Sequence, residues 1–292
     1  MALVGFSLQP DQEFLERTAE IALAADYVEI APETTWFEEP DGTLRPNGFH
    51  AQFAAFARDA KKACVAHGVA ISLYGGDPTR RARWLARLRA DQAVFSYLWY
   101  TDHLGTTQLA GENLALPVGV LPSAGVARAV RKTLAEMSTV IPDVGIENSA
   151  LYFALGDPVD ADTKFLAQVL RGKRSHLLLD LHNLYTNALN LGYAAEDWLA
   201  RVDLSRVIEI HLSGGVDADP AWLPPGKTLR LDSHDSAVPE GVWALYENYA
   251  PKCTRLRGVT LERMEGTVLT DDDVACVAEE LERTRDLARR LP

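Results

Sequence analysis

Eight short runs rich in apolar and β-branched residues recur along the chain, separated by amphipathic stretches with a helical period. The strand-like runs are VGFSL (4–8), YVEIAPE (27–33), VAISLY (69–74), VFSYLWYTDHL (94–104), VGIEN (144–148), HLLLDLHN (176–183), VIEIHLSG (207–214) and GVTLERM (258–264). The helical stretches are 11–25, 50–66, 79–90, 122–137, 160–170, 194–202, 239–250 and 271–291. Eight such pairs in 292 residues predict an α/β fold, a TIM barrel of the (β/α)8 type that forms a single catalytic domain over residues 1–292.

An open, doubly wound sheet is the competing α/β fold. Such sheets often carry a glycine-rich phosphate loop after the first strand, but the chain reads SLQPDQ (7–12) at that point. No stretch rich in Pro, Gly or Ser divides the chain into two domains. The barrel is therefore the favoured interpretation.

Composition excludes several classes of function. A formal net charge of −12 without a basic patch disfavours a nucleic-acid partner. No apolar run approaches ~18 residues, so we expect no membrane span, and no basic segment precedes the first apolar run as it would in a signal peptide. Cys64, Cys253 and Cys276 form no CxxC pair, which is typical of reduced thiols in the cytoplasm.

Side chains that can bind metals gather where six of the eight strand-like runs end. In a TIM barrel these carboxyl ends form the mouth that holds the active site. The residues are Glu33, Asp102, His103, Glu147, Asn148, Asp180, His182, Asn183, His211 and Glu262, joined by Asp232, His234 and Asp235 from the loop after the seventh strand.

Crowded carboxylates at a barrel mouth repel one another and lose hydration, so they require a compensating cation. Arg263 is the main basic side chain at the strand ends. A polyvalent metal is the simpler solution, and mixed imidazole and carboxylate ligands suit Fe, Mn or Zn. About eight candidates exceed the roughly four to six ligands of one metal, which favours two metals bridged by a carboxylate, with room for a third.

The histidines divide into two groups. His50 and His176 are expected to be structural or surface groups, and His67 is expected to close the helix before the third strand, at the wrong end for a ligand. His211 has two open interpretations, a ligand or a core histidine paired with Glu209 at i−2 on the same strand face.

The DSHD segment (232–235) is the densest of these clusters. If the segment is extended, Asp232 and His234 project from one face at i and i+2, as two metal ligands would. Asp235 then falls on the other face, which favours a supporting role.

At these residues the chain resembles the multinuclear non-haem iron-dependent oxidative enzymes (the MNIO family), which include peptide-modifying oxygenases of methanobactin biosynthesis. The matching segments are ISLYGG (71–76), TDHL (101–104), IEN (146–148), LLLDLHNLYTNALNLG (177–192), EIHLSGG (209–215), LDSHDSAVPEGVWALY (231–246) and LER (261–263). They follow the family's order and span most of the chain, and the runs around Asp180 and DSHD are the most specific.

The resemblance implies a TIM barrel with two or three iron ions (Fe2+/Fe3+) and O2 as co-substrate. Members oxidatively modify ribosomally made precursor peptides, often at cysteine, and many act with a separate partner protein that recruits the peptide leader. Carried over by position, Glu147 is the bridging carboxylate. The implied metal ligands are His103, Glu147, Asp180, Asn183, His211, Asp232, His234 and Glu262.

The chain also departs from the family pattern. Tyr74 stands where the third strand usually presents a histidine, and Gly215 where a second histidine often follows the first by four. His182 replaces a common Asn, and Met264 follows Arg263 where an acidic residue often ends the eighth run. Residues expected to support the ligands rather than bind metal are Glu33, Tyr74, Asp102, His182 and Asp235.

Three other functions use similar residues. A metal-dependent sugar isomerase or epimerase of the xylose-isomerase type places Glu, Asp and His at strand ends but does not consume O2. A phosphodiesterase with three zincs is disfavoured by the acidic charge. A barrel that only binds a peptide or partner predicts that Asp232 and His234 can be replaced without effect.

Overall fold

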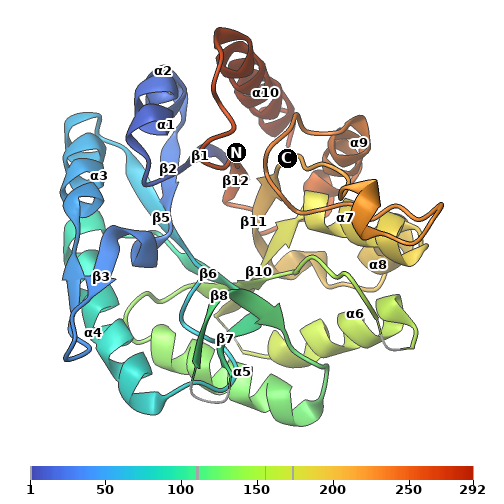
Figure 1. Cartoon of the computed structure of the whole chain (residues 1–292), viewed down its shortest axis with the longest axis horizontal. Coiled ribbons are helices and arrows are strands. Elements are labelled where there is room, and N and C mark those ends of the chain that lie inside the picture. The colour runs from blue at the N-terminus through green and yellow to red at the C-terminus, as the bar shows by residue number, and fades with distance from the viewer. Residues whose placement is uncertain (1, 110–111, 155, 173, 292) are drawn as a thin grey trace.

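The computed structural model describes residues 2–109, 112–154, 156–172 and 174–291. Eight parallel strands close into a barrel in the order β1-β12-β11-β10-β9-β6-β5-β2, which confirms the predicted TIM barrel (Figure 1). The barrel strands are β1 (Leu3–Leu8), β2 (Tyr27–Ile30), β5 (Ala63–Gly68), β6 (Tyr100–His103), β9 (Val144–Glu147), β10 (Ser175–Asp180), β11 (Val207–Leu212) and β12 (Gly258–Leu261).

Helices surround the barrel (Figure 1). They are α1 (Gln12–Arg17), α2 (Ala19–Ala24), α3 (Gly48–Asp59), α4 (Pro78–Phe95), α5 (Ala124–Met137), α6 (Pro158–Val169), α7 (Leu181–Leu191), α8 (Ala195–Leu199), α9 (Glu240–Tyr249) and α10 (Asp271–Ala288). Side-chain caps explain many of their starts. Asp77 accepts a hydrogen bond from Thr79 N, and Thr270 forms a capping box with Asp273 at the start of α10. Among the described residues, no helix is long and apolar enough to cross a membrane.

The third barrel strand is not where the sequence pattern put it. The prediction of a strand at 69–74 is wrong, because β5 spans Ala63–Gly68 and residues 69–77 form a loop. Helix α3 ends at Asp59, and Lys61 adopts a left-handed backbone (φ 54°) that turns the chain into the strand. Because the helix-like apolar pattern continues past this turn, the predicted strand begins six residues later than β5 does.

Two hairpins extend loops at the carboxyl ends of the strands. Strand β3 (Trp36–Glu38) pairs with β4 (Leu44–Pro46), and β7 (Gly105–Leu109) pairs with β8 (Glu112–Gly119). Neither hairpin was predicted. The second follows β6 directly and the first follows β2 after one short 3-10 helix (Pro32–Thr35), so both stand beside the mouth, as Figure 1 shows for β7 and β8.

Two aromatic rings close the amino-terminal end of the barrel interior. Tyr27 and Trp99 pack edge to face with centroids 5.5 Å apart, together with Val65. The rings fit because the strand beside them carries Gly258. A Cβ there would lie 2.6 Å from the Tyr27 hydroxyl and 2.9 Å from the Trp99 ring. The space above this floor is left for polar side chains.

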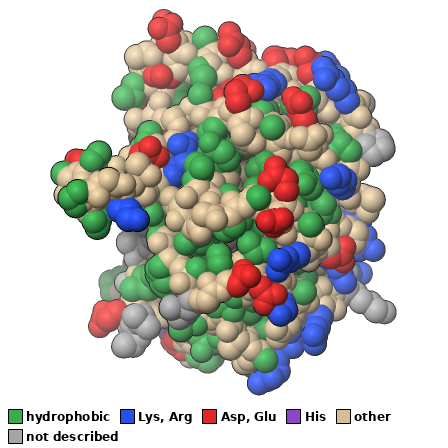
Figure 2. Space-filling model, turned by 90° about the vertical axis from the view of Figure 1, so that its right-hand side faces the viewer, with side chains coloured by type: hydrophobic (Ala, Val, Ile, Leu, Met, Phe, Trp, Pro, Cys, Tyr) green, Lys and Arg blue, Asp and Glu red, His purple; other side chains and the backbone are tan. Residues whose placement is uncertain are grey.

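The outer surface mixes charges of both signs. On the face shown in Figure 2, acidic and basic side chains are interspersed among apolar ones.

Candidate metal centre

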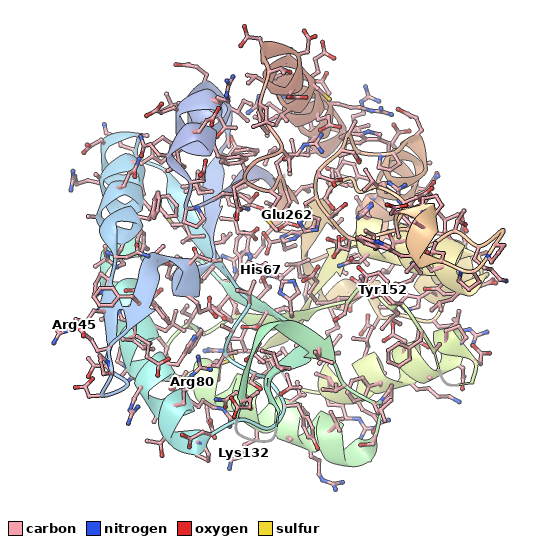
Figure 3. The ribbon with its side chains drawn as sticks, in the orientation of Figure 1. Arg45, His67, Arg80, Lys132, Tyr152 and Glu262 are labelled. Atoms are coloured by element: carbon pink, nitrogen blue, oxygen red, sulfur yellow. The ribbon has the colours of Figure 1, made fainter. Side chains whose placement is uncertain are left out.

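The carboxyl ends of the strands bring the eight predicted ligands into one connected cluster. His103 ends β6, Glu147 ends β9, Asp180 ends β10, Asn183 lies in the first turn of α7, His211 lies in β11, Glu262 follows β12, and Asp232 and His234 come from the loop after β11. Figure 3 shows Glu262 near the middle of the barrel, whereas the basic side chains it labels, Arg45, Arg80 and Lys132, lie toward the periphery.

Glu147 lies between two imidazoles. Its Oε2 is 3.3 Å from Nε2 of both His103 and His67, and the two rings are 4.7 Å apart. On each ring the other nitrogen is occupied, because His103 Nδ1 lies 3.2 Å from Gly68 O and His67 Nδ1 lies 3.0 Å from Thr101 Oγ1. These contacts turn both Nε2 atoms toward the carboxylate.

His211 lies between two carboxyl groups on opposite edges of its ring. Nε2 is 3.0 Å from Glu29 Oε2 in a hydrogen bond, and Nδ1 is 2.9 Å from Glu262 Oε2. A histidine that donates from one nitrogen to a carboxylate and presents the other is the usual arrangement of a metal-binding imidazole. We therefore assign Nδ1 as the nitrogen that faces the cluster.

Asp180 combines a structural and a free oxygen. Its Oδ1 caps α7 by accepting a hydrogen bond of 2.6 Å from Asn183 N, while Oδ2 is buried without a partner. The Asn183 side chain donates from Nδ2 to Glu147 Oε1 over 2.9 Å, which leaves Asn183 Oδ1 buried and unpartnered. These hydrogen bonds fix the side chains of Asp180 and Asn183, and each side chain keeps one buried oxygen that faces the cluster.

Asp232 and His234 do meet, but the predicted extended backbone is wrong. His234 has a left-handed conformation (φ 52°) in an irregular loop, and its Nε2 lies 2.7 Å from Asp232 Oδ1. His234 Nδ1 lies 3.8 Å from Glu262 Oε2, and this contact ties the loop to the rest of the cluster.

Six donor atoms of the predicted ligands are buried without a hydrogen-bond partner among the described residues. They are Glu147 Oε2, Asp180 Oδ2, Asn183 Oδ1, His211 Nδ1, His234 Nε2 and Glu262 Oε2. Several lie within 2.7–3.3 Å of another ligand-type atom but at angles that do not form a hydrogen bond. Two ligands of one metal, each about 2.1 Å from it, are about 3.0–3.4 Å apart. The cluster therefore fits metal ions better than a set of ion pairs.

The electrostatics of the metal-free cluster depend on protons. Burial lowers the pKa of His211, but Glu262 and Glu29 outweigh it and the pKa lies well above its ordinary value. His234 behaves likewise because of Asp232 and Glu262. Burial, with the charge of Glu147, raises the pKa of Asp180. A bound cation would replace these protons.

The expectation that His67 closes a helix is wrong. It lies near the carboxyl end of β5, buried, in ring contact with His103 and with His211 (centroids 5.0 Å). The third strand therefore does contribute an imidazole to the cluster, from His67 and not from position 74, where this chain has a tyrosine. The Lys61-Lys62 pair ahead of an apolar run was the signal that could have placed this strand.

Glu29 is the other residue that the sequence analysis missed. It lies inside β2, above Tyr27 on the same face, and burial raises its pKa to about 8. The outer residue expected from this strand, Glu33, instead accepts hydrogen bonds from Val69 N (3.3 Å) and Ala70 N (3.0 Å) and so holds the loop after β5.

The remaining supporting residues divide into those near the cluster and those apart from it. His182 Nδ1 lies 3.3 Å from Asp232 Oδ1. Asp102 accepts a hydrogen bond from Tyr100, beside Glu33, and its pKa is raised by burial. Asp235 accepts from Ser233 Oγ over 2.8 Å and braces the loop. Tyr74 is 38% exposed, and none of its described contacts reaches the cluster.

Glu29, Glu209 and His211 also lie close enough to hold an ion. We do not assign a site to them, because Glu209 already accepts hydrogen bonds from Tyr27, Trp99 and Thr260 and His211 Nε2 is bonded to Glu29. The hydrogen-bond partner of His211 is therefore Glu29, and the interpretation that Glu209 is its partner is wrong.

The donor set consists of imidazoles and carboxylates with one amide. The thiols of Cys64 and Cys253 are buried elsewhere, with pKa values raised by burial to about 12, so thiolate ligands are absent from the described cluster. Imidazole–carboxylate sets are the usual ligands of non-haem iron, manganese and zinc.

Comparisons with known structures support the barrel. A xylose isomerase domain protein from Planctomyces limnophilus aligns with a TM-score of 0.60 at 15% identity, covering 99% of this chain and 98% of that one. A D-psicose 3-epimerase with D-tagatose from Clostridium cellulolyticum H10 aligns with a TM-score of 0.58 at 12% identity, covering 99% of both. At these identities the likeness shows the fold alone.

Sequence comparisons are more specific. A UPF0276 protein of Rhizorhabdus wittichii is 32% identical over 297 residues, covering 98% of this chain and 95% of the relative. One of Bordetella bronchiseptica is 33% identical over 270 residues, covering 87% and 89%. The family model described as "RiPP precursor modification enzyme MbnB/TglH/ChrH" matches residues 3–288. The chain therefore belongs to this family of peptide-modifying enzymes.

Proposed function

We propose that this chain is an O2-dependent, multinuclear non-haem iron enzyme that oxidatively modifies a ribosomally synthesised peptide at a cysteine. The observation that carries the proposal is the set of six buried, unpartnered donor atoms at the barrel mouth, in a chain of a RiPP-modifying family. The whole barrel acts as one catalytic domain in the cytoplasm.

Two groups of side chains would each hold an iron. The first group is His67, His103 and Glu147. The second group is His211, Glu262, Asp180 and His234. Glu147 also lies close to Asp180 and His211, so its carboxylate could link the two groups. Asn183 and Asp232 complete the set from the same rim. Iron held there would supply O2 activation and one-electron redox chemistry.

The protein's own part is to orient ligands and to place the peptide. A cavity of about 320 Å3 adjoins the cluster, lined by residues that include Leu104, Ser149, Tyr152 and Phe165. Leu104 directly follows His103, and the Tyr152 hydroxyl lies 3.3 Å from Asp232 N. A mostly apolar pocket at this position suits a side chain of the precursor peptide beside the modified cysteine.

Iron loading tests the metal part of the proposal. After anaerobic incubation with Fe2+, we expect two or three irons per chain and Mössbauer signals from more than one iron environment. Asp180→Asn is expected to lose iron, whereas the control Asp197→Asn, on the exposed surface of α8, keeps it. One tightly bound zinc in place of iron would contradict the proposal.

Oxygen uptake tests the reaction. With a cysteine-containing precursor peptide encoded beside the gene, with or without a partner protein that binds its leader, we expect O2 consumption and a mass change in the peptide. A metal-dependent sugar isomerase or epimerase, which places similar side chains at the strand ends of such a barrel, is the alternative. Turnover of a ketose without O2 uptake would favour that alternative.

A further inference from the structure

We propose that His182 is a positioning residue that fixes the Asp232 carboxylate within the metal centre. The inference rests on the metal centre of the proposed function but not on its reaction with O2. His182 lies in the first turn of α7, completely buried, two residues after Asp180.

Its hydrogen bonds define which nitrogen carries the proton. His182 Nδ1 lies 3.3 Å from Asp232 Oδ1 in hydrogen-bond geometry, and Nε2 lies 3.5 Å from Thr186 Oγ1, one helical turn along. A carboxylate can only accept, so Nδ1 is the donor and Nε2 accepts from the Thr186 hydroxyl. The helix thereby delivers a fixed N–H to Asp232.

The second imidazole beside Asp232 behaves differently. His234 Nε2 is closer to Asp232 Oδ1, at 2.7 Å, yet it makes no hydrogen bond and is buried without a partner. Asp232 and His234 therefore converge as two ligands would, while His182 makes a true hydrogen bond. This contrast assigns ligand roles to Asp232 and His234 and the orienting role to His182.

Helix α7 also holds the loop that carries Asp232. Asn190 donates to Arg230 O over 2.9 Å and accepts from Arg230 N over 2.8 Å. Two residues after Arg230, the Asp232 carboxylate meets the His182 ring. The loop is thus fixed to one helix at two points, and both contacts set the position of the same carboxylate.

Gly215 makes room for this arrangement. A Cβ at residue 215 would lie 2.2 Å from Leu231 O and 2.9 Å from His182 Cε1. The backbone carbonyl cannot move aside without displacing Asp232, which is the next residue. A glycine at 215 is therefore required for the His182 ring and the loop to pack together.

Metal titration of the full-length apoprotein with Co2+ tests the proposal. For His182→Leu, which removes the donor, we expect full metal content at saturation but a Kd about 10–100-fold weaker for at least one equivalent, with altered Co2+ absorption bands. For His182→Asn, whose amide N–H can donate to Asp232, we expect affinity within a few-fold of the wild type.

His176→Leu is the matched control. His176 is also buried, and its Nε2 lies 3.3 Å from Asp143 Oδ1, but it is near the start of β10, away from the mouth. We expect this variant to lose thermal stability and keep wild-type Co2+ affinity.

Three results would overturn the positioning role. They are wild-type affinity in His182→Leu, no rescue by His182→Asn, and loss of a whole metal equivalent at saturation, which would make His182 a ligand. If the wild-type protein binds no metal, the positioning role and the proposed function both fail. If it binds metal and shows the His182 effects but never consumes O2, only the proposed function fails.

Discussion

Glu209, on β11, and Glu262, directly after the neighbouring β12, are both buried, yet their surroundings are opposite. Glu209, near the floor, accepts hydrogen bonds from Tyr27 (3.1 Å), Thr260 (2.8 Å) and Trp99 (2.7 Å). Glu262, at the mouth, has an Oε2 with no hydrogen-bond partner although His211 Nδ1 is 2.9 Å away. The floor is a completed polar network, whereas the mouth keeps donor atoms unsatisfied for something that binds there.

The largest effect is expected from breaking the completed network. Glu209→Leu leaves Trp99 Nε1 and one of the Tyr27 and Thr260 hydroxyls without an acceptor, since these two hydroxyls can still bond to each other over 2.6 Å. We expect this to lower the free energy of unfolding by about 3–5 kcal/mol. Denaturant unfolding of the metal-free protein measures this. A loss below about 1 kcal/mol would show that the floor network does not stabilise the barrel.

A different result is expected at the mouth. Glu262→Gln should weaken metal binding by more than about 100-fold, because changes to outer partners alone typically cost 10–100-fold. It should cost the metal-free protein some stability, because the imidazoles of His211 and His234 outweigh burial, lower the pKa of Glu262 and so favour its charged form, but less than Glu209→Leu does, since Gln keeps the volume and an oxygen. Metal analysis and unfolding of the same variant test both parts, with the exposed Glu265→Gln as control.

Glu29 links the two regions, because it lies above the floor and holds a mouth ligand. Glu29→Leu removes the acceptor for His211 Nε2, so the ring can rotate and Nδ1 loses its fixed direction. We expect metal affinity to fall about 10–100-fold, with partial rescue in Glu29→Gln, whose amide oxygen still accepts. Equal affinities in the Leu and Gln variants would contradict the orienting role.

Solution pH changes the charge on the same atoms without any substitution. The raised pKa values of His211 and His234 mean that both imidazoles stay protonated to higher pH than ordinary histidines in the metal-free protein, and a metal must displace these protons. Affinity should therefore rise with pH, by up to about tenfold per pH unit for each proton released. Calorimetry in buffers of different ionisation heat measures the released protons, and a Kd independent of pH would refute the assignment of these nitrogens.

The fold was predictable from the sequence because each barrel strand repeats one local pattern. Positions at the carboxyl ends then converge by topology alone, which explains why the sequence suffices to place His103, Glu147 and Asp180 in one cluster. His67 was missed for a local reason. The run ACVAH follows an alanine-rich helix without Gly or Pro between them, so apolar period alone did not reveal the turn at Lys61.

Other features depend on contacts that sequence spacing does not encode. Glu29 and Glu209 are both inward-facing glutamates. Only their neighbours distinguish them, because Glu29 bonds to His211 of the cluster whereas Glu209 accepts from Trp99 of the floor. His234 meets Asp232 through a left-handed backbone that no periodic pattern indicates. Both distinctions arise from tertiary packing.

The rings of Tyr27 and Trp99 give the barrel interior a single entrance. Under the proposed function, metal ions and the peptide would both enter by this mouth, and a peptide bound there would lie between the cluster and the solvent. A metal lost during turnover could then not be replaced until the peptide leaves, so metal loading would have to precede peptide binding.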